Sequence, residues 1–356
     1  MTDGKKLLKL GGAMAMANLG IDRLFRNFNR RKITVIMYHG VTRHDYQPSV
    51  WTQLPVDLFR EQIMFLKKHY RVLYLHEFVS IIRNEMPLPD HSVLITFDDG
   101  LKNNYRVAFP VLRELQAPAA VFLTSEYINT DRILWFDELY LYMQQGWTDS
   151  AFKTVLNEFE IELDAHDLTH AYYQLAERLK RCPAEFRVKL VASLRERFPL
   201  EETSRLEDFR HLSWNEIDEM QDSGLVEFGL HTANHRILTR LRTEELETEV
   251  RQARNYLEQK LDRPMATFCY PNGVPKQDFN DEHMHYLEQN GFDCAFSTEN
   301  RLFDPTKDNR FSIGRVAVGN DLTAQRHFFR LNAAGVQPVV CGLLRKLLKR
   351  NWSCEI

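Results

Sequence analysis

Cysteine is scarce in this sequence, and the few cysteines form no recognisable pattern. The 356 residues include five of them, scattered and without a CxxC pair: Cys182, Cys269, Cys294, Cys341 and Cys354. An odd, scattered set argues against a disulfide framework and against a zinc site made of cysteines. A chain of this kind suits a reducing compartment, so we expect a cytoplasmic protein.

Long hydrophobic runs and a strong net charge are also missing. The apolar run at residues 10–21 is too short and too rich in small residues to cross a bilayer, and no other segment approaches the required length. It also lacks a clean cleavage site, so we interpret residues 1–30 as an amphipathic helix that stays in the protein. The formal net charge is −3 and no basic stretch with interleaved aromatic residues stands out, so we expect no nucleic-acid partner.

Internal repeats, low-complexity tracts and clear linkers are absent from the sequence. Hydrophobic residues make up 44% and charged residues 27%, which is enough apolar material for a packed core. These features favour one large domain with insertions over a string of small modules. They do not indicate an oligomeric state.

Short apolar segments alternate with amphipathic helical segments in the first third of the chain. The apolar runs lack polar residues at every second position, which is typical of parallel strands buried on both faces. This order predicts an α/β fold, with a parallel sheet or barrel inside a layer of helices. Strands are predicted at 33–41, 71–75, 93–97 and 119–123, and helices at 57–69, 77–85 and 104–116.

The alternation breaks at residues 130–210, which have helical periodicity and no strong strand. This segment is too long for a loop, so we predict a helical insertion. Alternation resumes at Ser213, which forms a predicted capping box with Glu216. The remaining strands are predicted at 226–230, 265–270, 293–298 and 313–318, with helices at 243–260 and 281–290.

Two adjacent carboxylates, Asp98 and Asp99, follow a predicted buried strand and precede Gly100. Because adjacent like charges raise each other's pKa, such a pair favours a nearby cation. The carboxyl end of a parallel strand is also where α/β folds place active sites. An ordinary solvated Asp-Gly turn is the alternative.

Two histidines, His231 and His235, follow another predicted strand at a spacing of four. On a helical turn both imidazoles would share one face, which is a recurrent metal-binding arrangement. With one carboxylate they make three protein ligands and leave a coordination position open for water, as in catalytic zinc sites. A second carboxylate, Asp98 beside Asp99, is then free to take a proton from that water.

Three segments resemble motifs of the NodB-homology polysaccharide deacetylases, carbohydrate esterase family 4. They are TFDDG (96–100), HTANH (231–235) and FCYPNG (268–273). The resemblance implies a deacetylase domain over residues 31–330, interrupted by the insertion. It also implies a distorted (β/α)7-type barrel, a divalent metal ion such as Zn²⁺, and hydrolysis of N-acetyl groups on a carbohydrate substrate.

The resemblance assigns roles to individual residues. Asp98 carries over as the general base that activates water. The first two motifs supply the metal ligands and the third supplies one wall of the substrate groove. The implied ligands are Asp99, His231 and His235, and the implied wall residues are Tyr270, Pro271 and Asn272.

Two departures from the family pattern stand out. The third motif commonly carries an arginine that braces the base, whereas this chain has Cys269 there; Arg315, on a late predicted strand, is a candidate replacement. Many members carry an acid histidine near the C-terminus, which is not found here. In a rearranged branch similar to the poly-N-acetylglucosamine deacetylases that strand comes first, and VIMYHG (35–40) fits it, with His39 as general acid or, alternatively, as a packed core histidine.

Two other functions stay open on sequence alone. A pair of histidines and one carboxylate is also the ligand set of non-haem iron enzymes, although these have no use for a second adjacent aspartate. A catalytically impaired glycan-binding protein of the same fold is the other possibility, because Cys269 departs from the motif.

Both ends of the chain are basic and amphipathic. Lysines alternate with leucines in residues 5–10, and LLRKLLKRNW (343–352) repeats this pattern in a predicted helix over 331–356. Such helices either lie on an anionic membrane surface or dock on the barrel. Peripheral contact with the inner face of the membrane would suit a lipid-linked glycan intermediate.

Overall fold

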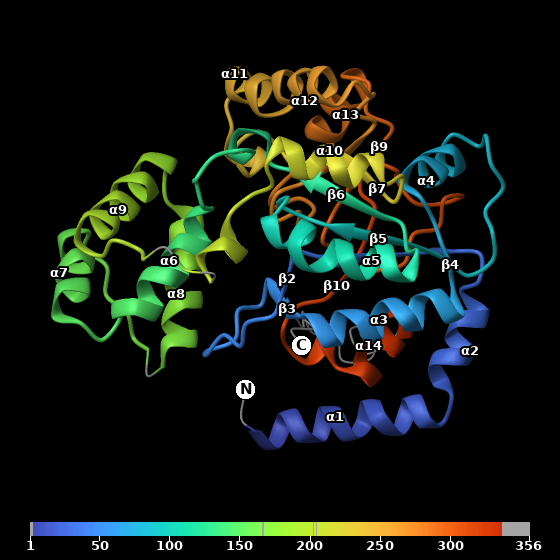
Figure 1. Ribbon diagram of the computed structural model, residues 1–356, viewed down its shortest axis with the longest axis horizontal. Coiled ribbons are helices and arrows are strands. Elements are labelled where there is room, and N and C mark those ends of the chain that lie inside the picture. Colours follow the sequence, from blue (N-terminus) through green and yellow to red (C-terminus); the bar gives the residue numbers. More distant parts are fainter. Residues whose placement is uncertain (1–2, 166, 202, 204, 337–356) are drawn as a thin grey trace.

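An all-parallel β-sheet forms the centre of the protein (Figure 1). The computed structural model describes residues 3–336, except 166, 202 and 204. The strands follow one another in the order β10-β1-β5-β6-β7-β8-β9, and β4 pairs with the start of β5. They are β1 (Ile33–Tyr38), β4 (Arg71–Val72), β5 (Ser92–Phe97), β6 (Ala119–Leu123), β7 (Val226–Leu230), β8 (Thr267–Cys269), β9 (Cys294–Phe296) and β10 (Val316–Ala317).

The sheet curves until its first and last strands meet at one segment. Val316 and Ala317 of β10 pair with β1. Just upstream, Ile313 forms a parallel bridge with Phe296 of β9, and its amide donates to Ala295 O at 2.9 Å. Residues 313–317 therefore close the ring, and the predicted α/β fold with a distorted barrel is confirmed.

The strands are buried on both faces, as their continuous apolar sequences predict. All six residues of β1 and all six of β5 are buried. Alternate side chains enter two different clusters: Val35 and Leu94 join Phe122 and Phe296 in one, whereas their strand neighbours pack under the outer helices in the other. Burial of both faces is what a parallel sheet inside a helical layer requires.

Helices surround the barrel, and two of the predicted helical segments contain a π-helix: one at its start and one in its middle. The predicted helix at 104–116 starts as a π-helix, η1 (Asn104–Ala108), and is α-helical from Phe109 onward. Pro110 lies at this change because it lacks the amide that an uninterrupted helix needs. The α-helices around the barrel are α3 (Val56–His69), α4 (Leu75–Ile82), α5 (Phe109–Leu115), α10 (Trp214–Asp222), α11 (Thr243–Leu246), α12 (Ala253–Leu261), α13 (Asp281–Gln289) and α14 (Arg326–Ala333). The π-helix η5 (Glu247–Gln252) joins α11 to α12, and η2 (Ser125–Tyr127), η3 (Leu206–Phe209), η4 (Leu238–Arg240) and η6 (Leu322–Ala324) are short 3₁₀ turns.

Five predicted strands are shorter than expected, and those predicted at 265–270, 293–298 and 313–318 are reduced to β8, β9 and β10. The strand predicted at 33–41 ends at Tyr38, because the Gly40 amide turns away to Thr52 O and β2 (Gly40–Thr42) pairs with β3 (Gln53–Pro55) in a separate small sheet. The strand predicted at 71–75 stops at Val72, and α4 begins at Leu75. The capping box at Ser213 is confirmed.

The segment predicted as a helical insertion folds into four helices with a core of their own. They form a lobe beside the barrel (Figure 1) and are α6 (Trp135–Gly146), α7 (Ser150–Glu158), α8 (Leu168–Arg181) and α9 (Ala184–Arg197). A second cluster joins this lobe to the loop before β3. In it the Tyr140 hydroxyl donates to Pro48 O at 2.9 Å and the Tyr46 hydroxyl donates to Asp208 Oδ2 at 3.0 Å.

The N-terminal segment contains two helices where one was predicted. α1 (Asp3–Asn18) and α2 (Ile21–Phe28) are separated at Gly20, whose φ of 77° is left-handed. Ala13 of α1 packs against Leu331 and Ala334 beside α14. The predicted basic helix over 331–356 coincides with α14 only at its start, and residues 337–356 lie outside the described part of the chain.

Gly229 of β7 tests how tightly the barrel interior is packed. A Cβ atom there would overlap the Phe122 ring and lie 2.6 Å from Thr267 Oγ1. We expect Gly229→Ala to lower the free energy of unfolding by about 1–3 kcal/mol, measured by urea titration, because a filled core tolerates no extra methyl group. Gly12→Ala is the control, since a Cβ at Gly12 meets nothing within 4 Å; equal losses in both variants would contradict the packing argument.

Candidate active site

Asp98 and Asp99 lie in a tight turn at the carboxyl end of β5. The Asp98 amide donates to Tyr38 O at 2.9 Å, and the Gly100 amide donates back to Asp98 O at 2.9 Å. Asp99 and Gly100 have left-handed φ values of 70° and 71°. Both carboxylates are buried, with exposed fractions of 3% for Asp98 and 1% for Asp99. The solvated-turn alternative is therefore wrong.

His231 and His235 lie in a turn that is not helical, contrary to the predicted helical turn. Thr232 and His235 have left-handed φ values of 61° and 55°, which interrupt any helix. Glu249 accepts the Asn234 amide at 2.7 Å, and its backbone carbonyl accepts the Ala233 amide at 2.9 Å. This turn still brings the two imidazoles together, with ring centroids 4.9 Å apart.

The turns after β5 and β7 converge on one point. Nε2 of His231 and Nε2 of His235 each lie 3.3 Å from Asp99 Oδ1. Nδ1 of His231 lies 2.8 Å from Cys269 O, so it carries the proton and leaves the lone pair of Nε2 facing Asp99. Asp99 Oδ1 is buried and has no hydrogen-bond partner within the described part of the chain. Three electron-pair donors directed at one another without a hydrogen bond fit a cation.

The electrostatics of Asp99 agree with this geometry. Burial raises the pKa of the Asp99 carboxyl, but the imidazoles of His231 and His235 lower it by more, so that the pKa lies well below its ordinary value. The carboxyl is therefore an anion that can serve as a ligand.

A second group of potential ligands shares His231 but fits a cation less well. It consists of Asp98, His231 and Cys269. Burial raises the pKa of the Cys269 thiol, which keeps it protonated, and both oxygens of Asp98 are bound by Arg315. The group of Asp99, His231 and His235 is the better cation site.

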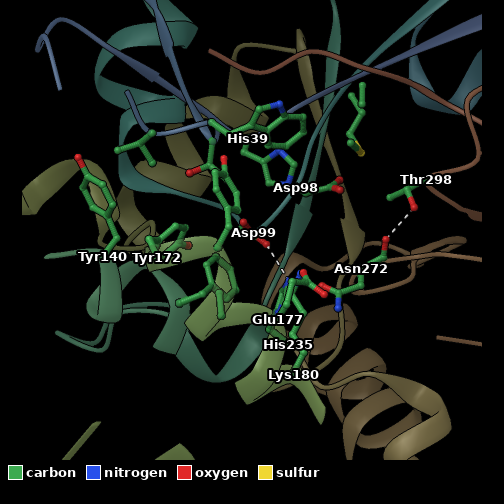
Figure 2. A pocket seen from close by; sticks show the side chains of 18 of the residues that line it. His39, Asp98, Asp99, Tyr140, Tyr172, Glu177, Lys180, His235, Asn272 and Thr298 are labelled. Atoms are coloured by element: carbon green, nitrogen blue, oxygen red, sulfur yellow. Dashed lines mark hydrogen bonds and ion pairs between the residues drawn. The ribbon is translucent and has the colours of Figure 1, made fainter. Parts of the chain in front are cut away.

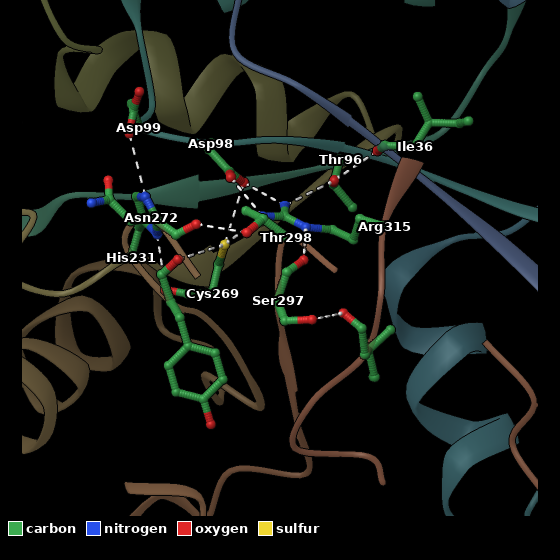
Figure 3. A network of polar contacts seen from close by, with 12 residues as sticks. Ile36, Thr96, Asp98, Asp99, His231, Cys269, Asn272, Ser297, Thr298 and Arg315 are labelled. Carbon is green, nitrogen blue, oxygen red and sulfur yellow. Dashed lines mark hydrogen bonds and ion pairs between the residues drawn. The ribbon is translucent and has the colours of Figure 1, made fainter. Parts of the chain in front are cut away.

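Arg315 lies against Asp98 in the barrel interior (Figure 3). Its Nη1 and Nη2 donate to Asp98 Oδ1 and Oδ2 at 2.7 and 2.8 Å, and Nη2 lies 3.1 Å from Cys269 Sγ. Its Nε donates to Ser297 O at 3.0 Å. Burial raises the pKa of Asp98, but the Arg315 guanidinium more than offsets it, so that the pKa is lowered. The structure thus places an arginine beside Cys269, where the usual motif arginine is missing.

His39 follows β1 and faces the same cavity as the two aspartates (Figure 2). Its ring centroid lies 5.4 Å from that of Trp51, and its buried Nδ1 has no hydrogen-bond partner among the described residues. Burial lowers the pKa of His39, and the charges of Asp99 and Asp98 oppose this effect.

The three predicted wall residues lie in different environments. Asn272 lines the cavity, and its carbonyl accepts the Thr298 hydroxyl at 2.7 Å. Tyr270 also borders the cavity, but its ring stacks on Phe279 and its hydroxyl donates to Phe311 O at 3.0 Å, away from the metal ligands. Pro271 is buried and does not line the cavity.

The cavity has a volume of about 370 Å³, and most of the residues that line it were not predicted from the sequence. One side comes from the barrel, whereas the other comes from the loop before β3 and from helices α6 and α8 of the insertion. Phe136 packs on the ring of His235 at 5.2 Å. The only available signal was the helical spacing of aromatic residues in these helices. The residues missed are Met37, Pro48–Thr52, Phe136, Tyr140, Thr169, Tyr172, Tyr173, Ala176, Glu177, Lys180, Thr298 and Ala317.

Comparison with known proteins identifies the family. The family model described as polysaccharide deacetylase matches residues 85–295, a range that includes both aspartates and both histidines. The chain belongs to the polysaccharide deacetylase family. Family members with curated names include the poly-beta-1,6-N-acetyl-D-glucosamine N-deacetylase of Staphylococcus epidermidis, 22% identical over 272 residues, which cover 74% of this chain and 67% of that protein. The Escherichia coli K12 protein of the same name is 32% identical over 72 residues, only 20% of this chain and 11% of its own.

Solved deacetylase structures share the fold. The deacetylase PplD of Streptococcus pyogenes, determined with acetate, has a TM-score of 0.55 at 17% identity and covers 82% of this chain and 95% of its own. IcaB from Ammonifex degensii has a TM-score of 0.54 at 20% identity, with 85% and 97% covered. At these identities the likeness concerns the fold alone.

The pair of Arg315 and Asp98 is a test of buried charge. We expect Arg315→Met to lower the free energy of unfolding by about 3–5 kcal/mol, because it leaves a buried carboxylate unpaired. The double variant with Asp98→Asn should recover much of that loss. Urea titration with chelator in every sample measures both.

Arg310→Met serves as the control, since the Arg310 side chain is 42% exposed and pairs with Glu288 at the surface. If the double variant is no more stable than Arg315→Met, the loss does not arise from the unpaired charge of Asp98.

Proposed function

We propose that this deacetylase is a metal-dependent hydrolase that removes the N-acetyl group from an amino sugar of a glycan. The observation that carries the proposal is the position of Asp99 Oδ1, 3.3 Å from both His231 Nε2 and His235 Nε2. Membership of the polysaccharide deacetylase family supports the reaction class.

Asp99, His231 and His235 would hold the metal ion. Two imidazoles and one carboxylate form a ligand set that zinc accepts, with a coordination position left for water. A zinc-type ion supplies a water of lowered pKa and polarises the carbonyl group that is attacked. Hydrogen bonding of His231 Nδ1 to Cys269 O fixes the ring in the orientation that a ligand needs.

Asp98 would act as the general base. Each carboxylate oxygen has two lone pairs. Arg315 occupies one on each oxygen and the Cys269 thiol also donates to Oδ1 at 3.5 Å, so a lone pair of Oδ2 remains for a proton from the attacking water. Arg315 also keeps Asp98 ionised and fixes its orientation. The departure at Cys269 left an impaired binding protein open. Arg315 donates to both oxygens of Asp98 and would take the bracing role in place of the motif arginine, which supports an active enzyme.

His39 would protonate the leaving amine. It shares the cavity with Asp98, and its lowered pKa means that an acquired proton is held weakly. When the carbon–nitrogen bond breaks, the electron pair stays on nitrogen and this proton completes the amine. Trp51, whose Nε1 donates to Asp321 Oδ2 at 2.9 Å, fixes one side of the His39 ring.

The aspartate and histidine roles can be separated by two variants. Asp98→Asn should lower acetate release from N-acetylglucosamine oligosaccharides by at least about 100-fold while metal content stays near one equivalent. His235→Ala should lose both, and chelation should abolish turnover of the unaltered protein. Acetate assay and elemental analysis are the measurements.

Asp90→Asn is the control, because Asp90 precedes β5 at the opposite end from Asp98 and its side chain is 50% exposed. Equal metal loss in Asp98→Asn and His235→Ala would show that the aspartate roles are assigned wrongly.

We also propose a cytoplasmic location with peripheral contact between the N-terminal helices and an anionic membrane, as a lipid-linked substrate would require. Among the described residues, no helix combines the length and apolar character that crossing a membrane takes. Leu19, Leu24 and Phe28 are nevertheless 77%, 65% and 83% exposed, and arginines 23, 26, 30 and 31 lie near them in the chain. Exposed apolar side chains flanked by cations suit the surface of an anionic bilayer.

Replacing two of these apolar side chains tests the contact. Leu24→Glu with Phe28→Glu should lower binding to vesicles of phosphatidylglycerol and phosphatidylcholine by at least about tenfold, because each buried side chain contributes about 1.5–3 kcal/mol. Co-sedimentation measures it. Val188→Glu with Val274→Glu is the control, since these valines are exposed far from the N-terminus in sequence. Unchanged binding of the first variant would rule out this contact surface.

A further inference from the structure

A second cavity of about 250 Å³ lies directly beside the catalytic cavity. The two share four lining residues, including the proposed metal ligand His235 and the cation Lys180; Figure 2 shows both with Asn272 at this side of the site. The fourth shared residue is Phe136. The remaining wall comes from the end of α8, the start of α9 and the chain that follows the HTANH turn.

The lining of this second cavity is strongly basic. Five cationic side chains surround it and no aspartate or glutamate lines it: Lys180, Arg181, Arg187, Arg236 and Arg240. Two of them have acidic partners at the rim, because Lys180 pairs with Glu177 at 2.6 Å and Arg236 pairs with Glu245 at 2.9 Å. Arg181, Arg187 and Arg240 form no ion pair within the described part of the chain. The cavity therefore has an excess of positive charge.

Arg187 is held in place despite this repulsion. Its Nη1 donates to Cys182 O at 2.8 Å and to Leu179 O at 3.2 Å, and its guanidinium lies 5.4 Å from the ring centroid of Trp135. Burial lowers the pKa of Arg187, and the nearby charges of Arg236 and Arg240 lower it further. α9 also begins at this cavity, but Glu185 in its first turn opposes the positive end of the helix dipole, so the charge of the cavity comes from its five cationic side chains.

Such an arrangement is costly unless an anion neutralises it. Guanidinium groups bind phosphate and carboxylate oxygens through two parallel hydrogen bonds, so clustered arginines suit oxyanions. The cavity is too small for a protein segment of any length but is large enough for one charged group with part of a sugar ring.

We propose that this basic cavity binds an oxyanionic group of the substrate, a phosphate or a carboxylate, attached within about one sugar unit of the N-acetyl group that is hydrolysed. The inference rests on the proposed function and narrows its substrate class to acidic glycans. Because Lys180, Arg181 and Arg187 come from the helical insertion, the insertion sets this preference, while the barrel supplies the chemistry.

Anion binding is measured first, separately from activity. Inorganic phosphate and glucuronate are titrated into the full-length protein by calorimetry. Arg240→Gln, with Arg187→Gln as the second variant, should weaken binding of at least one of these anions by about tenfold or more. Lys189→Gln is the matched control: it removes one positive charge from α9, the helix that carries Arg187, but Lys189 does not line the cavity. Arg240 is exposed, so its replacement leaves the fold intact.

Activity then tests the substrate class. Neutral N-acetylglucosamine oligosaccharides are compared with oligosaccharides that carry a phosphate or a glucuronate residue. Arg240→Gln should lower kcat/KM for the charged substrate by about tenfold and change it for the neutral substrate by less than about twofold. The better of the two charged substrates identifies the oxyanion.

The outcomes separate the inference from the proposed function. The anion site is overturned if Arg240→Gln binds anions as well as the unaltered protein does and shows the same ratio of kcat/KM between charged and neutral substrates. In that case the proposed hydrolase function is unaffected. Anion binding that depends on Arg240 without acetate release from any substrate supports the site and overturns the hydrolase.

Discussion

The structure depends on giving two buried, adjacent carboxylates separate counter-charges. Asp98 and Asp99 leave the end of one strand, and water cannot neutralise either of them. Arg315 balances Asp98, while His231 and His235 surround Asp99 at the proposed cation site. Because the two partners differ in kind, the carboxylates have different surroundings: a guanidinium fixes Asp98, whereas two imidazoles face Asp99, and the proposed roles of base and ligand rest on this difference. A barrel is suited to this task because its strand ends bring both partners to the same place.

Much of the fold followed from the periodicity of apolar residues. The continuous runs that became β1 and β5 predicted buried parallel strands, and the capping residues predicted the start of α10. Hydrophobic pattern could not show that the first strand would end at Tyr38, because that break depends on the Gly40 amide bonding to Thr52 O, across a loop. The left-handed turn at His235 was likewise not predictable, since it depends on a hydrogen bond from the Asn234 amide to Glu249 in η5.

The candidate site was predictable where its residues stand in short motifs, and less so elsewhere. Asp98, Asp99, His231 and His235 were found that way, and Arg315 was suggested because the motif arginine was missing. No local pattern linked the insertion to the cavity. Phe136 and Tyr172 reach the site only through the packing of α6 and α8 into a lobe that lies against the barrel. The short motifs lie at strand ends of the barrel, whereas the other wall of the cavity comes from the inserted lobe. Motifs therefore find the barrel residues of the site and miss those of the lobe.

The closing strand gives the protein a late step in its own assembly. Ring closure and the counter-charge of Asp98 both come from residues 313–317, which follow the proposed metal ligands and His39 in the chain. A nascent chain that has not yet released this segment from the ribosome therefore exposes an open sheet edge and an aspartate without its arginine. Closure of the barrel and pairing of Asp98 are thus coupled to the synthesis of one short segment, and truncation shortly before residue 313 removes the ring closure and the counter-charge together.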